Sequence, residues 1–138
     1  MTAFLLDTNV LSEIIKPKPS AEVELFMARE GDLWLSVIAL HELAYGVARV
    51  TDAIRRLKLQ TWVEAIRIQF RDRILPVDAA IAETAGRFRA FCAFHGRSLE
   101  PLDSLIAATA TVHAKVLATR NIRDFDTLGV DLRNPWEG

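Results

Sequence analysis

The chain has 138 residues, the size of one ordinary globular domain, so we expect a single domain spanning residues 1–138. Hydrophobic residues make up 51% of the chain and charged residues 25%, which supplies a full apolar core and excludes a disordered chain. The formal net charge of −1 excludes a strong overall attraction to nucleic acid or to a membrane surface.

Short apolar runs alternate with longer helical patterns along the chain. In order, the patterns predict a strand at 3–6, a short helix at 9–15, a helix capped by Ser20, a strand at 33–35, a helix from Ser36 to about Val50, a long helix at about 52–71, a short strand at 74–77, a helix from Asp78 to Gly96, a helix at 102–114, a strand at 115–118 and a candidate fifth strand at 130–132.

This alternation of strands and helices predicts βαβ units with parallel pairing. The expected fold class is therefore α/β, a three-layer α/β/α sandwich with a small, mostly parallel sheet of four or five strands. Pro76 predicts that the strand at 74–77 lies at an edge of the sheet or at a strand end, because proline cannot donate to a ladder.

No apolar run is long enough to cross a bilayer, and residues 1–3 lack the basic start of a signal peptide. The single cysteine, Cys92, lies in an apolar helical pattern that predicts a core position and leaves no internal disulfide. We therefore expect a cytoplasmic protein with no membrane partner.

Four acidic residues follow the predicted strands or open a neighbouring helix: Asp7, Glu42, Asp103 and Asp124. If the strands are parallel, all four carboxylates gather at the carboxyl edge of the sheet, where open α/β sheets bind ligands. Clustered carboxylates stay ionised together only with a cation among them, and oxygen ligands select Mg²⁺ or Mn²⁺. The pattern predicts a metal-dependent phosphodiesterase that activates water, with no side-chain nucleophile.

Each acidic residue also has a purely structural interpretation. Asp7 and Asp103 could cap the helices that follow them, and Glu42 could lie on a solvated helix face. Asp124 could belong to a simple connection between a strand and a helix. Asp78 and Asp126 are interpreted as surface or capping residues.

A resemblance to known proteins lies in four segments: residues 5–10, 42–43, 102–108 and 117–125. Together these segments resemble the PIN-domain family and, within it, the VapC/FitB-type toxins. The resemblance implies an Mg²⁺- or Mn²⁺-dependent ribonuclease acting on an RNA substrate. It also implies a homodimer or hetero-oligomer that a cognate antitoxin silences.

The same resemblance implies that the catalytic acids map onto Asp7, Glu42, Asp103 and Asp124. Asp7 and Asp103 are expected to be the primary metal ligands, and Glu42 and Asp124 to hold the metal through water or to bind a second ion. Asn121 stands where many PIN domains have an aspartate, which makes Asp124 the nearest acid in that segment.

Neighbouring polar residues are expected to assist this site. Asn9, Thr119 and Asn121 are expected to support the acids, and Asn121 could contact a metal-bound water or a phosphate. Arg120 and Arg123 are predicted to bind flanking phosphates. Salt bridges to Asp124 or Asp126 account for these two arginines equally well.

Three other functions compete with the nuclease. A haloacid-dehalogenase-type phosphatase needs a second aspartate two residues after the first, and Asn9 stands there. A receiver-like domain needs a lysine near the carboxyl end of its last strand, whereas Lys115 begins its strand. A non-catalytic PIN-like binding module is the remaining alternative.

Overall fold

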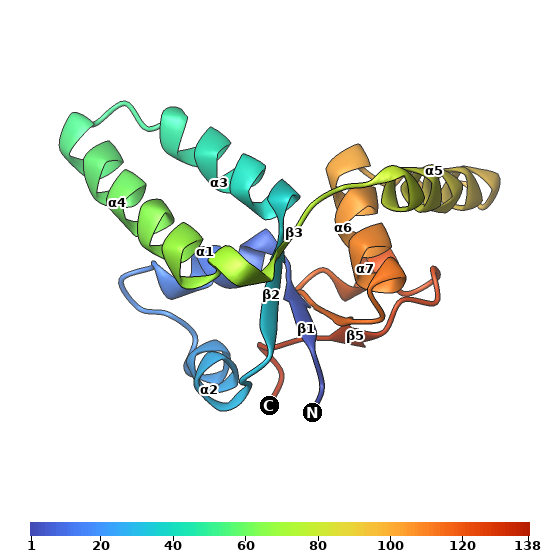
Figure 1. Ribbon diagram of the computed structural model, residues 1–138, viewed down its shortest axis with the longest axis horizontal. Helices are drawn as coiled ribbons and strands as arrows, with labels where there is room; N and C mark the ends of the chain where they lie inside the picture. The colour runs from blue at the N-terminus through green and yellow to red at the C-terminus, as the bar shows by residue number, and fades with distance from the viewer.

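Strand β1 (Phe4–Leu6) lies at the centre of a five-stranded sheet in the computed structural model, which describes residues 1–138 (Figure 1). The order is β3-β2-β1-β4-β5 and every neighbouring pair is parallel. The other strands are β2 (Leu33–Ser36), β3 (Ile74–Leu75), β4 (Val116–Ala118) and β5 (Leu132–Arg133). The predicted α/β fold is confirmed, and β3 takes the edge position that Pro76 indicated.

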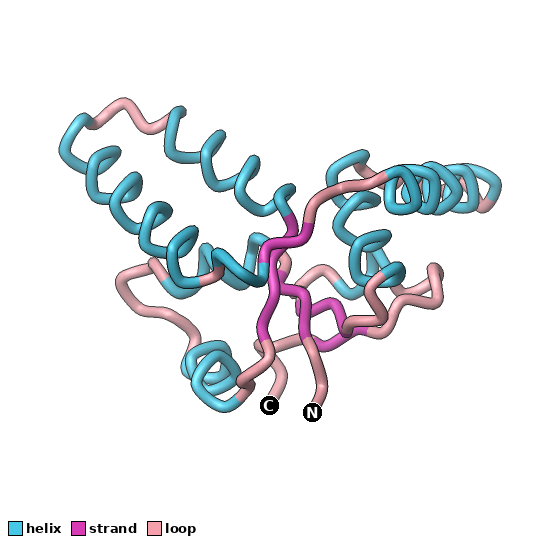
Figure 2. Tube along the Cα trace, viewed as in Figure 1, coloured by secondary structure: helices cyan, strands magenta, loops and turns pink.

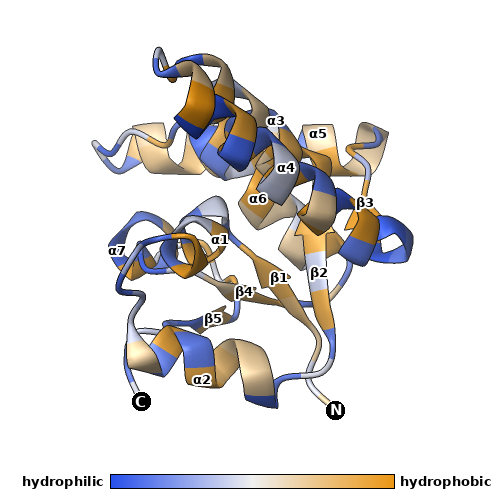
Figure 3. Cartoon of the chain, turned by 90° about the vertical axis from the view of Figure 1, so that its left-hand side faces the viewer, coloured by the Kyte–Doolittle hydropathy of each residue, from blue (hydrophilic) through white to orange (hydrophobic).

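Alternation of side chains along the strands divides the core between the two faces of the sheet. Phe4 and Leu6 of β1 pack on one face with the helices of the first half of the chain. Leu5 points to the opposite face and packs with Leu117 and the helices of the second half. Strands β1 and β2 are correspondingly mostly hydrophobic in Figure 3.

Seven helices cover the two faces (Figures 1 and 2). The first face carries α1 (Thr8–Ile14), α2 (Ala21–Arg29), α3 (Val37–Ala48) and α4 (Ala53–Gln69). The second carries α5 (Ala79–Phe94), α6 (Pro101–Val112) and α7 (Ile122–Phe125). A 3₁₀ turn, Arg71–Arg73, joins α4 to β3.

Side-chain caps begin three of these helices as their sequences predict. Ser20, Ser36 and Asp78 each accept a hydrogen bond from a backbone N–H in the first turn of α2, α3 and α5. Several predicted bounds differ by one or two residues, and the strand predicted at 74–77 ends at Leu75. The fifth strand lies at 132–133 rather than 130–132, and residues 122–125, which read as a loop, form α7.

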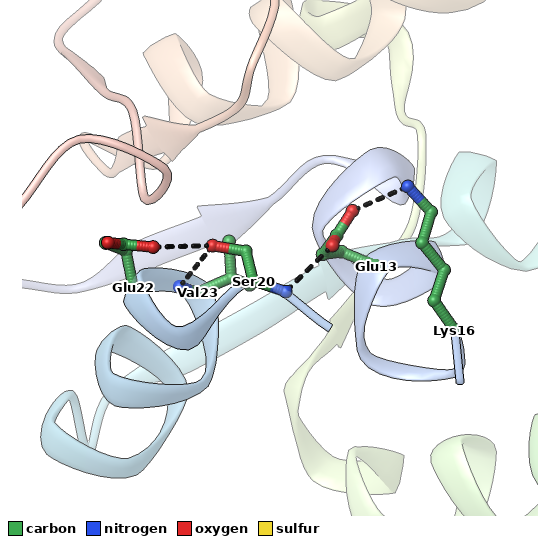
Figure 4. A network of polar contacts seen from close by, with 5 residues as sticks. All are labelled: Glu13, Lys16, Ser20, Glu22 and Val23. Atoms are coloured by element: carbon green, nitrogen blue, oxygen red, sulfur yellow. Dashed lines mark hydrogen bonds and ion pairs between the residues drawn. The ribbon is translucent and has the colours of Figure 1, made fainter. Parts of the chain in front are cut away.

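A buried carboxylate fixes the connection between α1 and α2 (Figure 4). Glu13 accepts hydrogen bonds from Lys16 Nζ at 2.7 Å and from the backbone N–H of Ser20 at 2.9 Å. Ser20 Oγ in turn accepts from the N–H of Val23 and donates to Glu22. The hydrogen bond from Lys16, followed by that from Ser20, lowers the pKa of Glu13.

The helices are too short or too polar for a bilayer: none combines the length and apolar character that a membrane span requires.

Candidate active site

Asp7 lies directly after β1 and is buried, with 5% of its surface exposed. Its backbone N–H donates to the carbonyl of Ala118, which continues the β1–β4 pairing beyond the strand. One carboxylate oxygen accepts from the N–H of Thr8 at 2.7 Å, and the other accepts from Thr119 Oγ1 at 2.8 Å. Asp7 therefore caps α1, as one interpretation predicted, and is also held from the end of β4.

Thr8 connects Asp7 to Glu42. Its hydroxyl donates to Glu42 Oε1 at 2.7 Å, across 34 residues of sequence. Glu42 lies one and a half turns into α3, partly exposed, so its side chain faces the carboxyl end of β1 rather than open solvent. No local pattern indicated this role of Thr8, because its partner lies on a distant helix.

Asp103 lies in the first turn of α6 and is partly exposed. Glu100 occupies the N-cap position, so Asp103 is not the cap of this helix. The middle of α6 carries small buried residues, with Ala107, Ala108 and Ala110 fully inaccessible. Their size lets α6 lie against the sheet and places Asp103 near its carboxyl edge.

Asp124 lies in the first turn of α7 and is exposed. The α7 turn is held by Arg97, whose guanidinium donates to the carbonyl of Arg123 and pairs with Asp126 at 3.4 Å. Asp126 is thus a surface residue with a structural partner, in agreement with its interpretation. Arg97 is a contributor to this region that no sequence pattern indicated.

The four carboxylates influence one another electrostatically. Burial raises the pKa of Asp7, and the charges of Glu42 and Asp124 raise it further, against the hydrogen bonds from Thr119 and Thr8. Burial, followed by the charges of Asp7, Glu42 and Asp124, raises the pKa of Asp103 to about 6. Carboxylates from four separate segments therefore repel one another at one edge of the sheet.

Three neutral polar residues surround Asp7. Asn9 Nδ2 lies 3.5 Å from Asp7 Oδ2 and 3.4 Å from Thr119 Oγ1. The backbone N–H of Asn121 donates to Thr119 Oγ1 at 3.0 Å, which orients the hydroxyl toward Asp7. Asn9 Oδ1 is buried and has no hydrogen-bond partner, so the site contains an oxygen that is free to accept.

The donor set suits a hard divalent cation, since it offers carboxylate and amide oxygens and no sulfur or imidazole. No three acidic, histidine or cysteine side chains stand close enough to ligate one ion in their present positions. Burial and, after it, repulsion between the carboxylates raise the pKa of Asp7 and Asp103, and a bound cation would stabilise the ionised forms against both. The residues fit the predicted metal in their chemistry.

Arg120 lies in the segment between β4 and α7, and Arg123 lies within α7. Neither forms an ion pair within 4.0 Å, so the predicted alternative of salt bridges to Asp124 or Asp126 is wrong. The Arg120 guanidinium instead lies over the ring of Trp136, 5.1 Å from its centroid.

Known proteins are similar to this chain in fold and in sequence over nearly its whole length. The PIN domain family model matches residues 4–130. The protein "Toxin FitB" of Neisseria gonorrhoeae (strain ATCC 700825 / FA 1090) is 36% identical over 135 residues, which cover 96% of this chain and 97% of that protein. The "tRNA(fMet)-specific endonuclease VapC" of Shigella flexneri is 34% identical over 137 residues, 99% of each chain.

Among solved structures, FitAcB from Neisseria gonorrhoeae superposes with a TM-score of 0.92 at 35% identity and covers 98% of this chain and 99% of that one. The parallel sheet with acids at its carboxyl edge and the family match define the class: this chain belongs to the PIN-domain family. Within that family its full-length relatives include the FitB and VapC toxins.

Proposed function

We propose that this chain is an endoribonuclease of the VapC/FitB type that hydrolyses RNA phosphodiester bonds with Mg²⁺ or Mn²⁺. We also propose that it is the toxin of a type II toxin–antitoxin pair. The single observation that carries the nuclease is the meeting of Asp7, Glu42, Asp103 and Asp124 at one sheet edge, with raised pKa values at Asp7 and Asp103. The names of the full-length relatives, a toxin and an RNA endonuclease, support it.

In this proposal Asp7 and Asp103 hold the divalent cation, and Glu42 and Asp124 support it or hold a second one. When bound, the cation would lower the pKa of an attacking water and offset charge on the phosphate oxygens. Thr119 and Thr8 keep the Asp7 carboxylate in place by hydrogen bonds to both of its oxygens. Thr8 also orients Glu42, and Asn9 and Asn121 complete the polar surroundings.

Arg120 and Arg123 are proposed to bind phosphates of the RNA that flank the cleaved bond. Both guanidiniums lack carboxylate partners although Asp124 is close in sequence, which leaves their donors available. This contact is local, since the net charge of −1 provides no overall attraction to RNA.

The proposed partners are RNA, a cognate antitoxin and a second copy of the chain. The long hairpin of α3 and α4 exposes Tyr45, Ile54, Leu57 and Ile68, with exposed fractions of 59%, 71%, 63% and 60%. Apolar surface of this extent on one hairpin is typical of a protein interaction site.

We propose that residues 1–138 act as one nuclease domain in the cytoplasm.

The test compares Asp7→Asn and Asp103→Asn with wild type in cleavage of total RNA. Each variant should lose at least about 100-fold in rate, because an amide is a weaker ligand and carries no charge. Asp72→Asn is the matched control, since Asp72 lies in the 3₁₀ turn with a side chain 92% exposed. Circular dichroism establishes that each variant is folded.

EDTA should stop the reaction, and added Mg²⁺ or Mn²⁺ should restore it. Cleavage that persists in EDTA, or that survives in both substituted proteins, would contradict the proposal. Wild-type protein that binds metal and antitoxin but cuts no RNA would instead support a non-catalytic PIN-like module.

A further inference from the structure

A pocket of about 470 Å³ lies beside the acidic site, between the segment 120–124 and the C-terminal segment 134–137. Its volume is within the usual range for small-ligand pockets. Asp124 belongs to both the pocket wall and the acidic cluster, so the two sites adjoin. A nucleotide in this pocket would be next to a phosphodiester held at the acids.

One wall of the pocket is suited to phosphate. Arg120 and Arg123 line it without an ion-pair partner, although Asp124 and Glu137 line the same pocket. Trp136 supports Arg120 through its ring. Arg97 donates hydrogen bonds to Asp126 and to the carbonyl of Arg123. Asp126 is therefore already paired and is not available to Arg120 or Arg123.

Asn134 and Glu137, from the C-terminal segment, form a second wall of the pocket, which is suited to the edge of a base. Asn134 Oδ1 accepts from the backbone N–H of Trp136 at 2.9 Å, which orients the amide and leaves its Nδ2 without a protein partner. A hydrogen bond from the N–H of Glu137 to the carbonyl of Asn134, at 3.1 Å, holds both residues in one turn. The wall therefore combines an amide donor with a carboxylate that accepts twice.

We propose that this pocket binds one nucleotide of single-stranded RNA beside the cleaved bond, with its phosphate on Arg120 and Arg123 and its base edge on Asn134 and Glu137. The proposal rests on the proposed nuclease function. Guanine is the base that matches this wall, because its Watson–Crick edge presents two adjacent N–H donors beside a carbonyl acceptor. The pocket thus determines which nucleotide stands next to the cut.

The binding test uses the full chain with Asp7→Asn, which should remove cleavage and replaces no residue that lines the pocket. The four 5′-mononucleotides are titrated in turn, and the Trp136 indole resonance, assigned with Trp136→Phe, reports binding by ¹⁵N NMR. GMP should bind most tightly of the four. Arg123→Gln should weaken it about tenfold, while Arg49→Gln, at the exposed residue that caps the C-terminus of α3, should not.

Asn134→Ala should reduce the preference for GMP over AMP by about tenfold, since one amide contact discriminates between bases by that order. In the active protein the same substitution should change the base found beside the cut sites and leave the Mn²⁺ affinity unchanged. Equal binding of all four nucleotides would overturn the proposed subsite for guanine. An equal loss of GMP affinity in Arg49→Gln and Arg123→Gln would also overturn it.

The outcomes separate the two proposals. RNA cleavage with an unchanged base preference in Asn134→Ala refutes the subsite and leaves the nuclease standing. Specific GMP binding by a protein that cuts no RNA refutes the nuclease and leaves the subsite. Displacement of GMP by an acidic peptide but not by oligoribonucleotides would assign the pocket to a protein ligand and overturn the proposal.

Discussion

Thr8 shows how a neutral residue can organise two acidic ones. Its backbone N–H donates to Asp7 and its hydroxyl donates to Glu42, both at 2.7 Å. Hydrogen bonds of this kind fix the orientation of a metal ligand before the metal arrives, and their loss typically reduces metal affinity 10- to 100-fold.

Thr8→Val preserves the shape of the side chain and removes the hydroxyl donor to Glu42. We expect Mn²⁺ affinity, measured by isothermal titration calorimetry, to fall at least tenfold, while Thr8→Ser keeps the wild-type value. Any purely structural effect of replacing Thr8 would be similar in both variants, so a difference in Mn²⁺ affinity between them reports the hydroxyl. Equal affinities for Val and Ser would show that Glu42 does not depend on this contact.

The raised pKa of Asp103, about 6, predicts an unusual response of the metal-free protein to pH. A carboxyl whose pKa is higher in the folded state than its unfolded value of 3.8 is protonated more readily when folded. Folding is therefore favoured as the pH falls from 7 toward 4, and this contribution is lost as the pH rises through 6.

Asp103→Asn should remove this dependence and raise the Tm of the metal-free protein at pH 7.5, by roughly 3 °C. Divalent metal should stabilise wild type more at pH 7.5 than at pH 5, because protons compete with it for the same carboxylates. Differential scanning fluorimetry with EDTA and with Mn²⁺ measures both effects. A wild-type Tm insensitive to metal at pH 7.5 would contradict this account.

At the scale of elements, the turn between α1 and α2 depends on Glu13. Glu13→Gln keeps an acceptor for the Ser20 N–H but removes the charge that Lys16 pairs with. Since the pKa of Glu13 is lowered in the fold, its contribution is present above pH 4.5 and is lost as the pH falls through the folded value.

Glu13→Gln should therefore lower the Tm at pH 7, by roughly 3 °C, and have a smaller effect near pH 3. Glu22→Gln is the control, since Glu22 is exposed and its side chain accepts a hydrogen bond only from the Ser20 hydroxyl. A larger effect at pH 3 than at pH 7 would show that the carboxylate charge of Glu13 is not the stabilising feature.

The elements differed in how well local sequence predicted them. Ser20, Ser36 and Asp78 were identified as caps because a cap acts on the turn that follows it. Helix α7 was missed because its four residues are too few to show a helical period. The fifth strand was predicted at 130–132 instead of 132–133 for a similar reason, since β5 contains only two residues.

The site was predicted less completely than the fold. The acids at strand ends were recognisable, since parallel strands bring their carboxyl ends to one edge. The bond from Thr8 to Glu42 and the contacts of Arg97 join segments that lie 26 or more residues apart. Such pairings depend on tertiary packing, and no local pattern encodes them.

At the scale of the whole molecule, the hairpin of α3 and α4 extends from the sheet (Figure 1), and several of its apolar side chains are exposed. Ile54, Leu57 and Ile68 recur at helical spacing on α4 and form one stripe. Isolated chains rarely leave such a stripe uncovered.

Leu57→Asp should weaken self-association by at least tenfold, because it places a charge in the proposed interface. Sedimentation velocity over a concentration series measures this change. Leu25→Asp on α2, where the leucine is 48% exposed, is the control and should behave as wild type. Unchanged self-association of Leu57→Asp would show that the interface lies on another face of the molecule.

The central pair of strands has a consequence for how the protein is made. Strand β1 lies beside β4, and the Asp7 amide and carboxylate are both bound by residues 118 and 119. A ribosome must therefore synthesise most of the chain before the first acid has its partners or Asp124 exists. Under the proposed function the acidic site stays incomplete during translation, so an antitoxin has to bind only the released protein.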